Sequence, residues 1–216
     1  MTRDLLSDLP PLAGTEVLAE GAAVLRGFAA AEAGALVAAL APVAEISPFR
    51  RMVTPGGHTM SVAMTNCGEG GWVTDRAGYR YQPDDPETGR PWPAIPTAFL
   101  DVAGRAAGAA GFPGFRPDAC LVNRYEPGTR LALHQDRNER DFGQPIVSVS
   151  LGLPTIFLFG GGRRSDRPRR VPLAHGDVVV WGGPSRLAFH GVAALADGLH
   201  RATGRLRFNL TLRKAF

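Results

Sequence analysis

The chain has 216 residues, of which 44% are hydrophobic and 20% are charged. This composition excludes an intrinsically disordered chain, and the length suffices for one domain with a substantial core. The formal net charge is +4 at pH 7. An anionic partner is compatible with that charge, but charge alone does not identify the partner as a nucleic acid.

The cysteines and the N-terminus indicate the compartment. The only cysteines, Cys67 and Cys120, form no Cys-x-x-Cys pair, which excludes a disulfide scaffold and a structural zinc cluster. Residues 1–8 contain two aspartates where a secretory signal needs basic and then apolar residues. No apolar stretch approaches membrane-spanning length. We therefore expect a soluble, cytoplasmic protein.

The N-terminal half predicts two helices on either side of a loop-rich segment. Residues 1–29 look irregular at first and then contain a short apolar run over 22–25. Apolar residues at helical spacing predict a helix over 30–44, which a proline should kink or end early. Residues 48–92 combine glycines with scattered aromatic residues and predict a lid, whose aromatic side chains either pack onto the core or provide a base-stacking surface. A second helix is predicted over 94–110.

The C-terminal half predicts eight short strands separated by turn residues, a spacing typical of a sandwich or a jelly roll. An arginine-rich loop over 163–170 interrupts them; it is either a solvated loop or, beside a nucleic-acid site, a phosphate clamp. The predicted strands cover residues 120–125, 130–134, 146–151, 155–159, 170–173, 177–181, 186–192 and 207–213.

Two histidines and one aspartate are candidate metal ligands. His134 and Asp136 are two residues apart in a segment that alternates like a strand, so their side chains point to one face. His190 lies in another strand-like segment. Two imidazoles and one carboxylate on one face of a metal suit non-haem Fe(II) and its oxygen chemistry. Taken alone, the pattern fits a solvated carboxylate and two ordinary histidines better.

The last predicted strand, 207–213, alternates strictly between polar and apolar residues. Its polar face either meets water, as is usual in an antiparallel sheet, or lines the interior of a barrel. In the second case Arg207 and Arg213 could grip a small dicarboxylate from both ends, and Asn123 and Tyr125 would add neutral donors. 2-Oxoglutarate is such a dicarboxylate and supplies the electrons that Fe(II) needs to activate oxygen. The metal site and the dicarboxylate site therefore support each other.

Longer motifs accompany these residues. They are Ser47-Pro48-Phe49-Arg50, Met52-Val53-Thr54-Pro55-Gly56-Gly57, Met60-Ser61-Val62-Ala63-Met64-Thr65-Asn66-Cys67-Gly68, Pro117-Asp118-Ala119-Cys120, Asn123-Arg124-Tyr125, His134-Gln135-Asp136, Pro145-Ile146-Val147-Ser148-Val149-Ser150-Leu151-Gly152 and His175-Gly176-Asp177-Val178-Val179-Val180-Trp181-Gly182-Gly183. With the last strand, they resemble the AlkB family of Fe(II)- and 2-oxoglutarate-dependent nucleic-acid demethylases, and most closely its bacterial members, over almost the whole chain.

The resemblance implies a mainly β fold (α+β). Its core would be a double-stranded β-helix, a cupin-like jelly roll, with flanking N-terminal helices and a nucleotide-recognition lid. It implies one domain over 1–216, with an N-terminal extension and helix over 1–47, the lid over 48–92, and a helix plus the core over 93–216. It makes His134, Asp136 and His190 the iron ligands, and it assigns 2-oxoglutarate to Asn123, Tyr125, Arg207, Asn209 and Arg213.

The resemblance also implies a substrate site. Trp72 would stack on a flipped base opposite the ring of His134, and further contacts would come from Tyr79, Arg80, Tyr81, Asn138 and Arg164. Two residues depart from the family pattern. Asn138 replaces an aspartate near the base edge, which puts base preference in doubt, and His58 replaces a tyrosine of the lid.

The implied activity is oxidative demethylation of N-alkylated bases, 1-methyladenine and 3-methylcytosine, in single-stranded or damaged DNA, with RNA left open. It would use Fe(II), 2-oxoglutarate and O2, and proceed through a ferryl intermediate to formaldehyde, succinate and CO2. One alternative is an oxygenase of the same chemistry that acts on protein or a small metabolite. Another is a non-catalytic cupin-like binding module. We expect a monomer with no membrane association.

Overall fold

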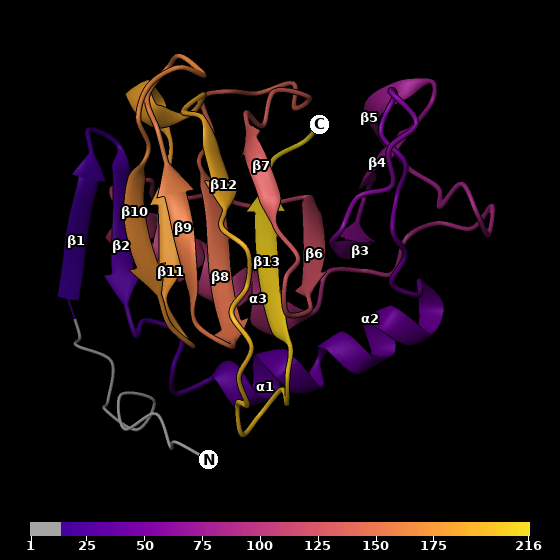
Figure 1. The fold of residues 1–216 in the computed structure, drawn as a ribbon, viewed down its shortest axis with the longest axis horizontal. Helices are drawn as coiled ribbons and strands as arrows, with labels where there is room; N and C mark the ends of the chain where they lie inside the picture. Colours follow the sequence, from indigo (N-terminus) through magenta and orange to yellow (C-terminus); the bar gives the residue numbers. More distant parts are fainter. Residues whose placement is uncertain (1–13) are drawn as a thin grey trace.

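The computed structural model describes residues 14–216. Two antiparallel sheets are stacked face to face (Figure 1). The longest helix lies behind the larger sheet, and two shorter helices run along the bottom of the view (Figure 1). This arrangement confirms the predicted jelly-roll fold. Each of the eight strands predicted in the C-terminal half is present as one of β6–β13, although the segment predicted over 186–192 forms a strand only from His190 onward.

The larger sheet has seven strands in the order β1-β2-β11-β8-β13-β6-β3. Its central strands are nearly continuous runs of β-branched and other apolar residues, which suits strands that are covered on both faces. The strands are β1 (Gly14–Ala19), β2 (Ala22–Arg26), β3 (Ala63–Gly68), β6 (Ala119–Tyr125), β8 (Ile146–Gly152), β11 (Val178–Trp181) and β13 (Arg207–Arg213).

The smaller sheet has four strands in the order β10-β9-β12-β7. Strand β12 pairs with β7 on one side and with β9 on the other. A short 3-10 helix, Gly183–Ser185, precedes β12. The strands are β7 (Leu131–His134), β9 (Thr155–Phe159), β10 (Arg169–Leu173) and β12 (His190–Val192).

Two apolar clusters hold these layers together. One lies between the larger sheet and the helices, and includes Phe99, Val122 and Leu210. The other lies between the two sheets, and includes Phe157 and Trp181. The interior of the sandwich is therefore closed by apolar side chains around the polar residues described below.

The predicted helices form with shifted bounds. The helix expected over 30–44 is divided into α1 (Ala33–Ala38) and α2 (Leu40–Ile46), because Pro42 offers no N–H to the carbonyl of Ala38. The helix expected over 94–110 is α3 (Thr97–Ala109), with Pro96 as its N-cap. Pro96 disfavours helical geometry at the residue before it, which delays the start.

The interpretation of residues 1–29 as irregular is wrong for its described part, which forms the hairpin β1–β2; residues 1–13 lie outside the described residues. Within 48–92, β3 pairs with β6 as an edge strand of the larger sheet. The domain boundaries themselves stay a prediction.

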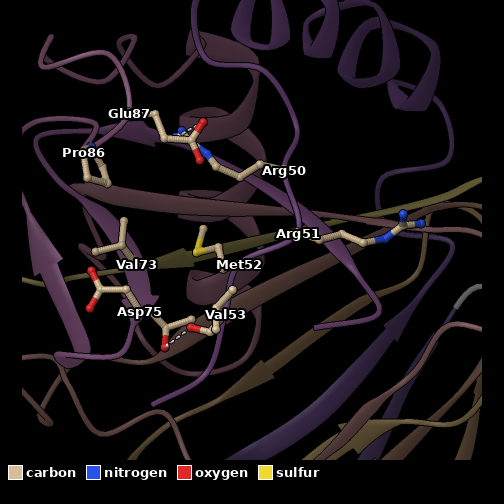
Figure 2. A pocket seen from close by; sticks show the side chains of 9 residues that line it. Arg50, Arg51, Met52, Val53, Val73, Asp75, Pro86 and Glu87 are labelled. Carbon is tan, nitrogen blue, oxygen red and sulfur yellow. Dashed lines mark hydrogen bonds and ion pairs between the residues drawn. The ribbon is translucent and has the colours of Figure 1, made fainter. Parts of the chain in front are cut away.

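A separate hairpin stands beside the stacked sheets: β4 (Gly71–Asp75) and β5 (Gly78–Gln82), here called the lid hairpin (Figure 1). Thr74 Oγ1 of β4 donates to the carbonyl oxygen of Val53 at 3.2 Å. Arg50, in the same segment as Val53, makes ion pairs with Asp85 and Glu87, which follow β5. Arg50 and Glu87 lie near Met52 and Val73 (Figure 2). A cavity of about 260 Å³ lies at this junction. The hairpin and the chain that follows it thus contact the segment that leads into β3.

Among the described residues, no helix is long and apolar enough to cross a membrane.

Two neighbouring histidines, His175 and His200, give the fold a pH dependence. The rings of His175 and His200 lie 4.4 Å apart, and His175 Nδ1 accepts a hydrogen bond from the backbone N–H of Gly152 at 2.9 Å. Burial, followed by the neighbouring positive groups, lowers the pKa of His175. The unfolded chain therefore binds a proton more readily, so this stability is present above the unfolded pKa, about 6.5, and is lost as the pH falls through the folded pKa.

We expect His175→Asn to reduce the fall in thermal stability between pH 7 and pH 5, because an amide oxygen keeps the acceptor for Gly152 without titrating. Thermal melting at several pH values measures this. His58→Asn, at an exposed histidine, should keep the wild-type slope. An unchanged slope in His175→Asn would contradict the expectation.

Candidate active site

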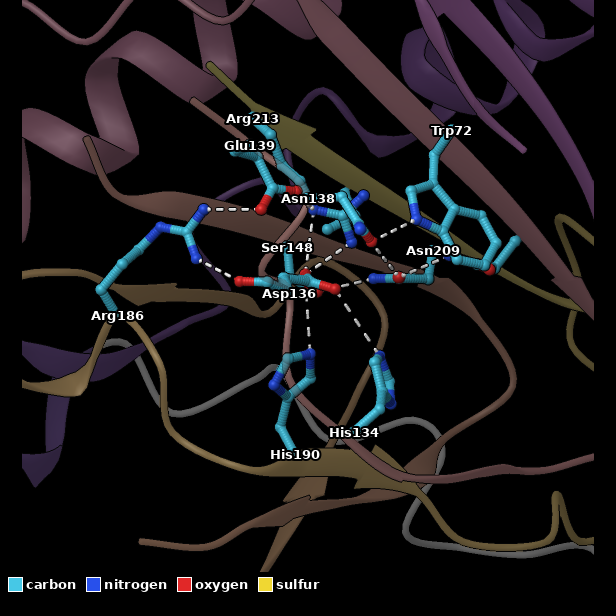
Figure 3. Close-up of polar contacts among 12 residues, drawn as sticks. Trp72, His134, Asp136, Asn138, Glu139, Ser148, Arg186, His190, Asn209 and Arg213 are labelled. Atoms are coloured by element: carbon cyan, nitrogen blue, oxygen red, sulfur yellow. Dashed lines mark hydrogen bonds and ion pairs between the residues drawn. The ribbon is translucent and has the colours of Figure 1, made fainter. Parts of the chain in front are cut away.

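Strands β7 and β12 bring the three predicted metal ligands together. His134 and His190 are register partners, and Asp136 follows β7 by two residues. His134 Nε2 lies 3.8 Å from Asp136 Oδ1, and His190 Nε2 lies 3.7 Å from Asp136 Oδ2. One ligand atom from each residue lies within 4.8 Å of the others (Figure 3). The three groups therefore face one point.

The backbone fixes the orientation of both imidazoles. Nδ1 of His134 lies 2.8 Å from the carbonyl oxygen of Ala132, and Nδ1 of His190 lies 3.0 Å from that of Ala188. A neutral imidazole that donates from Nδ1 keeps a free lone pair on Nε2 for a metal. Burial, and then the neighbouring His134, lower the pKa of His190 to about 4. His190 is thus neutral at pH 7, the form that binds metal.

Asp136 is held as an anion by an arginine. Nε and Nη2 of Arg213 donate to Asp136 Oδ2 at 2.9 and 2.6 Å. Burial alone would raise the pKa of Asp136, but the charge of Arg213, with His190 and His134, keeps it well below its ordinary value. The carboxylate is therefore ionised, with one oxygen paired and the other directed toward His134.

The polar face of β13 lies inside the sandwich. Arg207 is 1% exposed and Arg213 is 4% exposed, which excludes the interpretation that this face meets water. Asn209 and Asn123 are register partners on β13 and β6, and Asn123 Nδ2 lies 3.3 Å from Asn209 Oδ1. The predicted 2-oxoglutarate residues are thus brought into one interior.

Arg207 is a buried cation that makes no ion pair within residues 14–216. Its Nη2 donates to Ser150 Oγ at 3.1 Å, and its guanidinium lies 4.9 Å from the ring centre of Tyr125. Among the described residues, Nε and Nη1 of Arg207 and the hydroxyl of Tyr125 have no hydrogen-bond partner. Buried donors of this kind are rare unless a ligand satisfies them. A carboxylate from outside the protein would do so, and 2-oxoglutarate fits this part of the site.

One cavity of about 580 Å³ joins the metal ligands to Arg207. Its volume lies within the usual range for small-molecule sites. Besides the three candidate ligands, the predicted residues that line it are Asn123, Tyr125, Arg207, Asn209, Arg213, Trp72, Tyr79, Asn138 and Arg164.

The predicted substrate residues divide into two groups. Trp72 and Tyr79 stack at 5.6 Å between ring centres, and Trp72 Nε1 donates to Asn138 Oδ1 at 3.3 Å. Arg80 and Tyr81 are not among the residues that line the cavity. Arg80 pairs with Asp75 within the lid hairpin. The structure thus separates Arg80 and Tyr81 from the other predicted substrate residues.

Two buried charged residues behind the metal ligands were not identified from the sequence. Glu139 and Arg186 form an ion pair of 3.1 Å, with side chains 1% and 3% exposed. Arg186 Nη1 also donates to the backbone carbonyl of Asp136 at 2.8 Å (Figure 3). Glu139 lies in a polar loop segment, and Arg186 is the first residue of the segment predicted as a strand over 186–192. Nothing in either local pattern distinguishes the residue from a solvated charge.

Comparison with known proteins places this geometry in a family. The sequence matches the profile of the 2OG-Fe(II) oxygenase superfamily over residues 21–213. It is 58% identical over 212 residues to the alpha-ketoglutarate-dependent dioxygenase AlkB of Escherichia coli, covering 98% of this chain and 97% of that protein. The chain belongs to the AlkB family.

One further sequence relative and one solved structure are also similar to this AlkB-family protein. The DNA N(6)-methyladenine demethylase ALKBH1A of Arabidopsis thaliana is 40% identical over 110 residues, which cover 50% of this chain and 32% of that protein. The solved structure of OsALKBH1 superposes with a TM-score of 0.81 at 28% identity, covering 93% of this chain and 100% of that one. The AlkB-family protein described here is an Fe(II)- and 2-oxoglutarate-dependent dioxygenase, with O2 as its second co-substrate.

Proposed function

We propose that this enzyme oxidatively demethylates 1-methyladenine and 3-methylcytosine in single-stranded or damaged DNA, with RNA as a second class of substrate. Oxidative demethylation of alkylated bases follows from its membership of the AlkB family. The observation that carries the proposal is the shared cavity, in which His134, Asp136 and His190 lie beside the unpaired guanidinium of Arg207.

His134, Asp136 and His190 would hold Fe(II), and Arg207 with Tyr125 would bind the distal carboxylate of 2-oxoglutarate. When bound, the metal and 2-oxoglutarate supply the oxidation of the methyl C–H bond by O2, with succinate and CO2 as products. The oxidised methyl carbon leaves the base as formaldehyde.

The aromatic pair of the lid hairpin suits a methylated base. Methylation at N1 of adenine or N3 of cytosine gives the ring a positive charge, which the faces of Trp72 and Tyr79 attract. Asn138, whose amide oxygen accepts from Trp72, and Arg164 line the same cavity. We infer that these four residues hold the extruded base and its backbone. Extrusion costs a few kcal/mol, and less where the lesion already pairs badly.

A panel of methylated oligonucleotides tests this function. We expect formaldehyde and succinate in equal amounts from DNA with 1-methyladenine or 3-methylcytosine, in the presence of iron, 2-oxoglutarate and O2. His134→Ala should release neither product. An enzyme that consumes 2-oxoglutarate but yields no formaldehyde from any methylated oligonucleotide would overturn the proposal.

The arginine-rich loop between β9 and β10 distinguishes a nucleic acid from a protein or small metabolite as substrate. Arg164 of this loop lines the cavity, and Arg163 and Arg167 make no ion pair among the described residues. For binding that relies on phosphate contacts, the logarithm of the binding constant falls linearly with the logarithm of the salt concentration. On single strands the slope is about −0.7 for each phosphate contacted. Binding of single-stranded DNA should show such a slope, and Arg163→Ala should reduce it.

Two further expectations stay predictions. The enzyme is proposed to be a monomer, which sedimentation measures directly, and a cytoplasmic protein, which fractionation of the cells tests. Neither bears on the chemistry of the site.

A further inference from the structure

Four charged side chains and one phenol meet behind the metal ligands. They come from the lid hairpin, from the loop after β7, from the segment before β12 and from the end of β13. The side chains of the four charged residues are between 1% and 9% exposed, and their two positive and two negative charges balance. We call this set the Arg213 cluster: Tyr81, Asp136, Glu139, Arg186 and Arg213.

Tyr81 and Glu139 hold the guanidinium of Arg213. The hydroxyl of Tyr81 donates to Glu139 Oε1 at 2.7 Å and accepts from Arg213 Nη1 at 3.2 Å. Arg213 Nε lies 3.5 Å from the same Glu139 oxygen. Burial keeps the pKa of Tyr81 well above its ordinary value, so the phenol retains the proton that it donates. The orientation of Arg213 thus depends on a residue of the lid hairpin.

Arg213 in turn fixes the carboxylate of Asp136. Two of its N–H groups occupy Oδ2, and Oδ1 faces His134. Arg186 holds the backbone of Asp136 in place through its carbonyl. If Arg213 turned away, Oδ2 would lose both partners and the carboxylate could rotate. Partners of a ligand that are held in this way set its direction and its affinity for metal.

We propose that Tyr81 and Glu139 are positioning residues of the metal site, which act through Arg213 on Asp136 and tie the lid hairpin to the bound metal. The inference rests on the metal ligands of the proposed function. It also explains why Tyr81 is absent from the cavity lining. Because coupling between two sites is reciprocal, metal binding orders the hairpin, and loss of the Tyr81 hydroxyl weakens metal binding.

Titration of the purified protein with Mn²⁺ tests the proposal without turnover, since this ion accepts the same nitrogen and oxygen ligands. Tyr81→Phe removes only the hydroxyl, and Glu139→Gln removes only the charge. We expect each to weaken Mn²⁺ binding by about 10- to 100-fold. In the wild type, Mn²⁺ should also slow amide hydrogen exchange in β5, and in Tyr81→Phe this protection should be lost.

Thr74→Val is the matched control. It removes a hydroxyl of the same hairpin that donates to the carbonyl of Val53 at 3.2 Å. Among the described residues, this hydroxyl makes no hydrogen bond to a member of the Arg213 cluster. It should lower stability but keep the Mn²⁺ affinity within about twofold. If Glu139→Gln fails to fold, Tyr81→Phe still decides the question.

Wild-type affinity and wild-type exchange protection in Tyr81→Phe would overturn the inference. So would an equal loss of affinity in Thr74→Val, because the effect would then be a general weakening of the hairpin. A wild-type protein that binds no Mn²⁺ would overturn the metal ligands themselves, and with them the proposed function.

Discussion

Replacing Asp136 with asparagine is expected to abolish turnover while leaving the fold intact. The single oxygen of the amide would be occupied by the two N–H groups of Arg213, which lie 2.9 and 2.6 Å from the present carboxylate oxygen. The metal would then face an NH2 group, which cannot act as a ligand. We expect the affinity for Mn²⁺ to fall by more than the roughly 100-fold that loss of a supporting partner causes.

Metal titration and formaldehyde release measure the effect of Asp136→Asn, and circular dichroism verifies the fold. Asp141→Asn is the control, because this exposed carboxylate in the same loop accepts only the backbone N–H of Gly143. It should retain wild-type affinity and turnover. Metal binding by Asp136→Asn at wild-type strength would show that Asp136 is not a ligand.

Replacing Arg207 with methionine is expected to abolish 2-oxoglutarate binding and to leave the free protein at least as stable as the wild type. Without ligand, Nε and Nη1 of Arg207 are buried and unpaired, so an apolar side chain of similar length relieves a desolvation cost. With ligand, the lost partner of a buried charge costs about 2–5 kcal/mol, or roughly 30- to 4,000-fold in affinity.

Calorimetric titration with 2-oxoglutarate in the presence of Mn²⁺, and thermal melting with and without it, separate the two effects of Arg207→Met. Arg205→Met is the matched control, since Arg205 lies two residues earlier and makes an exposed pair with Asp197. It should bind 2-oxoglutarate normally. A destabilised Arg207→Met protein that still binds 2-oxoglutarate would assign Arg207 to the fold rather than to the ligand.

Local periodicity accounts for what could be predicted of the site. The spacing of His134 and Asp136 is that of one strand face, and the alternation of 207–213 places its polar residues together. Sequence alone left open whether that face meets water. The answer depends on the second sheet, which covers β13 and buries Arg207, and stacking of sheets is not a local property.

The residues that sequence reasoning missed or misplaced are those with distant partners. Glu139 and Arg186 are 47 positions apart, and each resembles a solvated surface charge in the sequence because its partner is distant. Arg80 is instructive for another reason. It lies between Tyr79 and Tyr81 on β5, so the strand period directs it to the opposite face. Identifying β5 as a strand would have placed Arg80 on the face opposite to Tyr79 and Tyr81.

The facing positions of His134 and His190 have a mechanical consequence. Strand β7 is an edge strand with a partner on one side only, and β12 is three residues long. A metal ion bound by both imidazole rings would cross-link these two strands, in addition to the backbone hydrogen bonds that pair them. Removal of the metal by a chelator should therefore weaken the pairing of β7 with β12 before the rest of the fold unfolds. Limited proteolysis of the chelator-treated protein should cut first beside β7.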